Sequence, residues 1–138
     1  MPSRLTRVAL PARRRVVLAI MFLIAAAHVI GIGRYLPGEL SALYSSYFSD
    51  IVIPFGYYFL LFLPGSQWRW VSRWETKASI VFLLPSAAET LQYFGVGLLG
   101  STFDPLDYVM YAIGAISGAI VDTQVFARTF AFWRNGSL

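Results

Sequence analysis

The chain has 138 residues, enough for one domain, and 57% of them are hydrophobic whereas 13% are charged. Charged residues make up about a quarter of a typical soluble domain, so this composition argues against a water-soluble fold and predicts an integral membrane protein. The formal net charge of +4 comes from arginines that lie between apolar runs, a pattern that argues against nucleic-acid binding, and the absence of cysteine excludes disulfides and thiolate metal sites.

Four apolar stretches, taken in chain order, predict four transmembrane helices at about residues 16–33, 40–64, 78–99 and 106–127. Each is long enough for a hydrocarbon core of about 30 Å at about 1.5 Å per residue. The second stretch contains Pro54, so we expect it to kink or to begin as a separate short helix. Residues 1–138 should therefore form a single all-α membrane domain.

The positive charges predict the orientation of these helices. All but one of the lysines and arginines precede the first stretch, separate the second from the third, or follow the fourth; the exception is Arg34. Short loops rich in lysine and arginine stay in the cytoplasm, so both termini should be cytoplasmic. A competing interpretation is a signal peptide, because arginines, an apolar run and Ala25-Ala26-Ala27 imitate one; its removal would leave three helices.

Polar residues inside the apolar stretches mark a candidate site. Glu89 lies in the outer half of the third stretch, where an ionisable group costs several kcal/mol unless it is protonated, paired or turned toward protein. Gln92 follows three residues later and shares its helix face. Asp104, Asp107 and Tyr111 begin a stripe along the fourth stretch. The two aspartates also suit a helix N-terminus, so capping is the alternative interpretation.

The same stripe continues with Gly114 and Gly118, a small-xxx-small pattern that lets another helix approach closely. We interpret these glycines as packing residues. Asp122 ends the stripe near Arg128, and we expect these two residues to form a surface ion pair.

Asp50 at the start of the apolar part of the second stretch, and His28 in the first, lie at a depth similar to that of Glu89. A single histidine in a helix is more often a packing residue than a ligand. A cluster of this kind would suit a divalent cation, a proton relay, or acid and base work on a lipid-linked substrate, and the sequence does not choose among them. Because the sequence has no GxSxG, HExxH, CxxC or phosphate-binding glycine loop, we expect no catalytic residue, resident metal or cofactor.

Three segments carry a family resemblance: Glu89-Thr-Leu-Gln92-Tyr-Phe94, Phe103-Asp104-Pro-Leu-Asp107, and Tyr111 through Gly118. Together they resemble the signature of VanZ-like membrane proteins, approximately ExxQxF, DxxDxxxN and GxxxG. Two positions depart from it, because no basic residue precedes Asp104 and Tyr111 stands where the family has asparagine. The resemblance implies a multi-pass protein of the bacterial cytoplasmic membrane, associated with the cell envelope, in a family whose founding member confers resistance to lipid-tailed glycopeptide antibiotics.

Three hypotheses for function follow. The first is an outward-facing acidic pocket, formed by Asp50, Glu89, Gln92, Asp104 and Asp107, that binds a lipid-linked or cationic ligand among the membrane lipids. The second is an accessory subunit that packs in a larger membrane complex, or in a homo-oligomer, through Gly114 and Gly118. The third, a membrane-embedded hydrolase or metal enzyme using His28, is not supported by any nucleophile motif.

Overall fold

A computed structural model describes residues 11–63, 70–97 and 102–135, which are almost entirely helical. Its helices are α1 (Ala12–Ile30), the 3-10 turn η1 (Ile32–Tyr35), α2 (Gly38–Leu60), α3 (Trp74–Tyr93), α4 (Pro105–Ile120), the π-helical segment η3 (Val121–Phe126), α5 (Ala127–Thr129) and α6 (Ala131–Asn135). The all-helical prediction is confirmed for these residues. Arg69, residue 64 at the predicted end of the second helix and residues 98–99 at the predicted end of the third lie outside the described residues.

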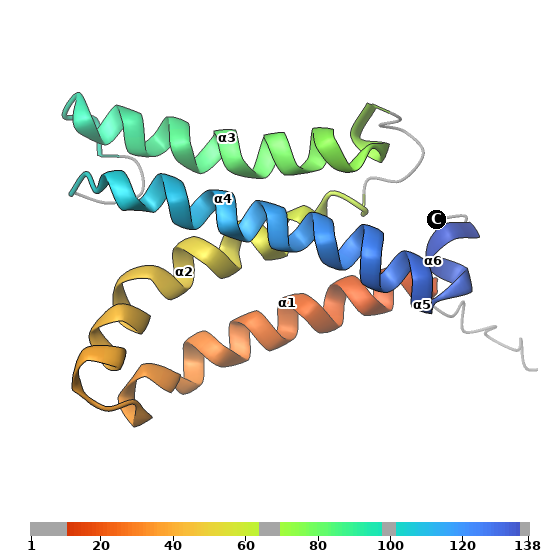
Figure 1. The fold of residues 1–138 in the computed structure, drawn as a ribbon, viewed down its shortest axis with the longest axis horizontal. Coiled ribbons are helices and arrows are strands. Elements are labelled where there is room, and N and C mark those ends of the chain that lie inside the picture. Colours follow the sequence, from red (N-terminus) through yellow and green to blue (C-terminus); the bar gives the residue numbers. More distant parts are fainter. Residues whose placement is uncertain (1–10, 64–69, 98–101, 136–138) are drawn as a thin grey trace, which may run out of the picture.

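The four long helices alternate in direction (Figure 1). α1 and α3 run one way, whereas α2 and α4 return, so Ala12 and α6 lie at the same end of the molecule. We call this the basic end, because it carries Arg13, Arg14 and Arg15 at the start of α1 and Arg128 and Arg134 near the C-terminus. The other end, which contains η1, the start of α2 and the start of α4, is called the acidic end.

Local sequence explains where the helices begin and end. The left-handed conformation of Gly31 (φ 64°) terminates α1, as glycine commonly does. Asp104 caps α4 by accepting a hydrogen bond from the backbone N–H of Leu106 at 2.9 Å, and Pro105 occupies the first helical position. The expected capping role of Asp104 is therefore present in the structure.

Several predicted boundaries were wrong. The first helix begins at Ala12 and not at residue 16, because arginine is a good helix former and allows Arg13–Arg15 to join the helix. The third begins at Trp74 and ends at Tyr93, earlier than predicted at both ends. The second is one continuous helix with Pro54 inside it, and it bends along its length (Figure 1). Proline removes the hydrogen bond to the carbonyl of Asp50, four residues earlier, which accounts for a bend.

Among the described residues, one helix, Pro105–Thr129 (25 residues), is long and apolar enough to cross a membrane, which is weak evidence of membrane association. Four spans are not supported by helix length and apolar character alone. The reason lies in the polar residues of the other helices. α1 begins with three arginines, α2 contains Asp50, and α3 contains Lys77 and Glu89.

α4 packs most extensively against α2 and α3. A side chain at Gly114 would overlap the carbonyl oxygen of Ile51, and a Cβ at Gly118 would lie 2.9 Å from the Cβ of Tyr58. α2 of the same chain therefore fills the small-residue stripe of α4. A partner subunit of the kind expected from these glycines could use them only by displacing α2.

The exterior and interior of the bundle have inverted polarity. Lys77 and Glu89 are each 2% exposed, whereas Phe22 is 71%, Leu23 65% and Val29 80% exposed. These two charged groups thus face protein, whereas these large apolar side chains face outward, the reverse of what is usual in a water-soluble domain.

Candidate functional site

A pocket of about 480 Å³ lies toward the acidic end, between α2, α3 and α4. Its lining comes from all three helices and from the residue Thr102 that precedes α4. The described residues that line it are Ser49, Asp50, Ile53, Pro54, Tyr57, Leu84, Pro85, Glu89, Gln92, Thr102, Asp107 and Tyr111. The structure therefore brings together Asp50, Glu89, Gln92, Asp107 and Tyr111, which the sequence separates by up to 61 positions (50 to 111).

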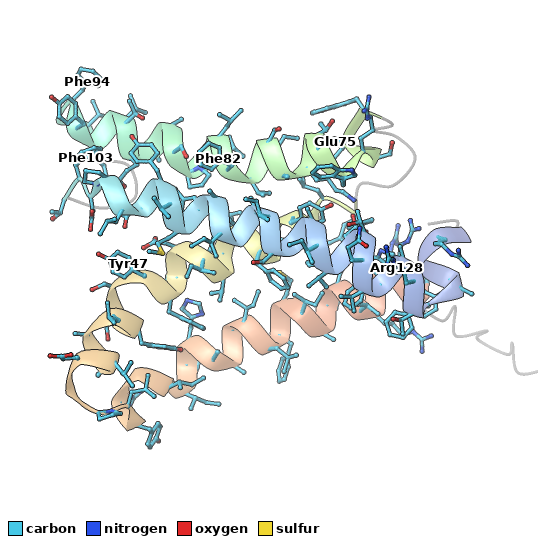
Figure 2. The ribbon with its side chains drawn as sticks, viewed as in Figure 1. Tyr47, Glu75, Phe82, Phe94, Phe103 and Arg128 are labelled. Carbon is cyan, nitrogen blue, oxygen red and sulfur yellow. The ribbon has the colours of Figure 1, made fainter. Side chains whose placement is uncertain are left out.

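Asp104, the remaining residue of the predicted acidic pocket, lies beside the pocket and not in its lining. Its backbone N–H donates to Glu89 Oε1 at 2.7 Å. Its Oδ2 accepts from the hydroxyl of Tyr47 at 3.5 Å, and Figure 2 shows Tyr47 on the part of α2 that approaches the start of α4. Glu89 therefore fixes the start of α4 to α3 while it also lines the pocket. This double role explains how its buried carboxyl group is partly satisfied.

The pocket is acidic and has no basic lining residue in the part of the chain that the structure describes. Asp50, Glu89 and Asp107 supply carboxyl groups, and Gln92 Oε1 is buried without a hydrogen-bond partner. A buried acceptor that lacks a donor is unfavourable by about 1–3 kcal/mol unless water or a ligand satisfies it. The pocket thus offers oxygen acceptors to a ligand that donates hydrogen bonds or carries positive charge.

The rim of the pocket is apolar. Ile53, Tyr57 and Leu84 line it and are also exposed on the surface of the bundle. These exposed lining residues belong to α2 and α3, whereas α4 contributes Asp107 and the buried Tyr111 to the lining. A molecule in this pocket would contact carboxyl groups and apolar surface together.

His28 lies outside the pocket lining. Its Nδ1 is 2.8 Å from the carbonyl oxygen of Ile24, so Nδ1 carries the hydrogen and donates. Nε2, 3.0 Å from the hydroxyl of Ser49, then accepts in the neutral ring. Nδ1 is therefore bonded within α1, and Nε2 joins α1 to α2, which agrees with a packing histidine. No group of three or more histidine, aspartate or glutamate side chains within the described ranges is placed to hold a metal ion.

A second polar cluster, at the basic end, was missed by the sequence analysis. The predicted surface pair between Asp122 and Arg128 is wrong, because Asp122 is buried and pairs with Lys77, whose Nζ lies 2.9 Å from Oδ2. The hydroxyl of Tyr58 donates to the same oxygen at 2.6 Å, and Trp133 Nε1 donates to Oδ1 at 2.8 Å. The signal that could have found it is the stripe itself, since Asp122 lies four residues after Gly118 on the face that packs inward.

The comparisons with known proteins found no matching family model, no matching curated protein and no matching solved structure. The resemblance to VanZ-like proteins stays a prediction from the motifs.

Proposed function

We propose that the chain is a multi-pass protein of the bacterial cytoplasmic membrane, in which α1 to α4 cross the bilayer and both termini are cytoplasmic. The inverted polarity of the bundle supports this. Lys77 and Glu89 lower the apolar character of α3, yet both side chains are buried, so the surface that α3 presents is formed by residues such as Leu83 and Leu84. A helix that keeps its ionisable groups inside can face lipid although its average composition is polar.

The arginines of α1 fit the same arrangement. Arg13, Arg14 and Arg15 occupy the first turn, and the exposed side chains that follow are apolar, among them Leu18, Phe22 and Leu23. Arginines at a helix end can extend their charged groups to the membrane surface. The alternating helix directions then put the basic end on the cytoplasmic side and the acidic end outside.

We further propose that the acidic pocket binds the cationic group of an amphiphilic, lipid-like ligand. The observation that carries this proposal is the placement of three carboxyl groups, Asp50, Glu89 and Asp107, around one pocket that no described basic residue lines. Its exposed apolar rim would lie against the acyl chains of the outer leaflet, so a ligand could enter sideways from the membrane. On the basis of the resemblance to VanZ-like proteins, we also propose that the protein acts in the cell envelope. The proposed ligand binding requires no catalysis.

The experiment is equilibrium binding to protein in zwitterionic detergent, with dansyl-labelled oleylamine as the cationic probe and dansyl-labelled oleic acid as its anionic counterpart. We expect saturable binding of the amine only, weakened about tenfold in Asp50→Asn and in Asp107→Asn, because each replaces a carboxylate by a neutral amide of the same shape. Glu39→Gln is the matched control, since Glu39 lies at the acidic end but does not line the pocket. Equal binding of the amine by wild-type protein and both aspartate variants would contradict the proposal.

A further inference from the structure

A second pocket, of about 450 Å³, lies at the basic end, and the acidic-pocket proposal does not use it. Its lining comes from α1, the residues that follow α2, the segment before α3, α3 itself and the C-terminal part of the chain. The charged residues among its lining are Arg13, Arg73, Glu75, Lys77 and Asp122. Apolar lining comes mainly from Leu61, Phe62, Val71 and Ala127.

The positive charge in this pocket is not fully matched by carboxylates. Asp122 is committed to Lys77, and Glu75 lies 3.3 Å from Arg73 in an exposed pair. Exposed pairs of this kind contribute little, so Arg73 is free to exchange partners. No carboxylate within residues 11–63, 70–97 and 102–135 lies at ion-pairing distance from Arg13.

Arg13 also retains unused hydrogen-bonding capacity. Its guanidinium donates to the backbone carbonyl of Trp133 and lies over two rings, 5.6 Å from the centroid of Phe62 and 5.5 Å from that of Trp133. Its Nε is buried and has no hydrogen-bond partner. A guanidinium with an unpartnered Nε–H, held by aromatic rings beside a pocket, is suited to an oxyanion such as phosphate.

The position of the pocket favours a lipid as the source of that phosphate. Trp74 lines the pocket and is 48% exposed, and Trp70 nearby is 60% exposed. Exposed tryptophans are typical of the level where lipid head groups meet acyl chains. The apolar lining would contact the glycerol and first methylene groups of a lipid, whereas free phosphate would leave that lining unused.

We propose that this pocket binds the phosphate of an anionic phospholipid from the cytoplasmic leaflet, with Arg13 and Arg73 as the phosphate-binding groups. The inference rests on the proposed membrane location of the chain. It is independent of the acidic pocket at the other end.

The test is native mass spectrometry of protein purified in mild detergent and supplied with equal amounts of phosphatidylglycerol and phosphatidylcholine. We expect one retained phosphatidylglycerol per chain, and retention about tenfold lower in Arg73→Gln, whose exposed side chain can be changed without disturbing the core. Arg13→Gln should have the same effect. The controls are Arg128→Gln, at the same end but outside the pocket lining, and Arg34→Gln, at the acidic end.

Equal loss in Arg73→Gln and Arg128→Gln would show nonspecific attraction to the basic end and overturn the proposal. A second experiment uses inorganic phosphate alone as the ligand. If it binds to wild-type protein, followed by tryptophan fluorescence, and displaces the phosphatidylglycerol at comparable concentration, the lipid part of the inference is wrong. Carbonate extraction of the membranes keeps the two proposals apart, because wild-type protein released by carbonate would contradict the membrane location itself.

Discussion

Lys77 of α3 and Asp122 of η3 form a buried ion pair, with Nζ 2.9 Å from Oδ2. The same carboxylate accepts hydrogen bonds from Tyr58 of α2 and Trp133 of α6. Lys77 Nζ also lies 3.5 Å from the ring centroid of Phe62. One carboxylate, which lies within the π-helical segment η3, therefore joins four separate parts of the chain at the basic end. Such segments are frequent at functional sites.

Removal of one member of this pair should destabilise the protein strongly. We expect Asp122→Ala to lower the free energy of unfolding by about 3–5 kcal/mol, because the buried Lys77 ammonium is left unpaired. The double variant Lys77→Met, Asp122→Leu should recover part of this loss, since it removes both charges. Denaturant unfolding in detergent measures the free energy of unfolding of the wild type, the single variant and the double variant. Purely additive losses in the double variant would contradict a direct pairing.

The attachment of the C-terminal helix α6 to the bundle should depend on Trp133. Trp133→Phe keeps an aromatic ring next to Phe62 and Phe126 but loses the N–H donor to Asp122, and we expect a loss of about 1–2 kcal/mol. Limited proteolysis should then cut near α6 faster than in the wild type. Phe132→Leu is the control, because Phe132 is exposed. Equal cleavage of wild-type protein and the Trp133 variant would show that this hydrogen bond does not hold α6.

The two roles of Glu89 can be separated. Glu89→Gln keeps an oxygen that accepts from the Asp104 N–H, so stability should change by less than about 1 kcal/mol. Loss of the charge should nevertheless weaken binding of dansyl-oleylamine about tenfold. Glu89→Ala should lose both the binding and the anchor for α4. A Gln variant that unfolds like the Ala variant would mean that the charge itself holds the helices together.

The small-residue stripe should tolerate no added volume. Gly114→Ala places a methyl group against the backbone of Ile51, which cannot move aside as a side chain can, and we expect a loss of about 1–3 kcal/mol or more. Gly118→Ala meets the Cβ and Cγ of Tyr58 at 2.9 Å, a less severe overlap than that at Gly114, and should also destabilise the protein because rotation of the ring leaves the Cβ in place. Ile116→Ala, on the exposed face of α4, is the control. Stability that is unchanged in Gly114→Ala would mean that α2 lies farther from α4 than described.

Much of this arrangement could be predicted from the sequence. Four apolar stretches gave four antiparallel helices, and polar residues at spacings of three and four pointed inward, so Glu89, Gln92, Asp107 and Tyr111 line one pocket. The stripe of α4 could be recognised because helix periodicity fixes which residues share a face. Periodicity does not determine which helix packs against that face. In this structure the packing helix is α2 of the same chain.

The pairing of charges could not be predicted in this way. Lys77 was assigned to a loop because it precedes the apolar stretch, yet it belongs to α3 and its ammonium reaches a carboxylate 45 positions away. His28 was expected at the depth of Glu89, but its side chain bonds the lining residue Ser49 and does not itself line the pocket. Depth follows from position along a helix, whereas direction and partner depend on how the helices pack together.

In the proposed orientation, the acidic end with its pocket faces outward from the membrane and the basic end faces the cytoplasm. The chain has no cysteine, so a single introduced cysteine reports on one position. We would label Thr102→Cys, which lies at the acidic pocket, and Thr129→Cys, at the basic end, with a membrane-impermeant maleimide in intact cells. We expect labelling of the Thr102 variant from outside and of the Thr129 variant only after lysis. Labelling of both variants in intact cells, or of the Thr102 variant only after lysis, would contradict it.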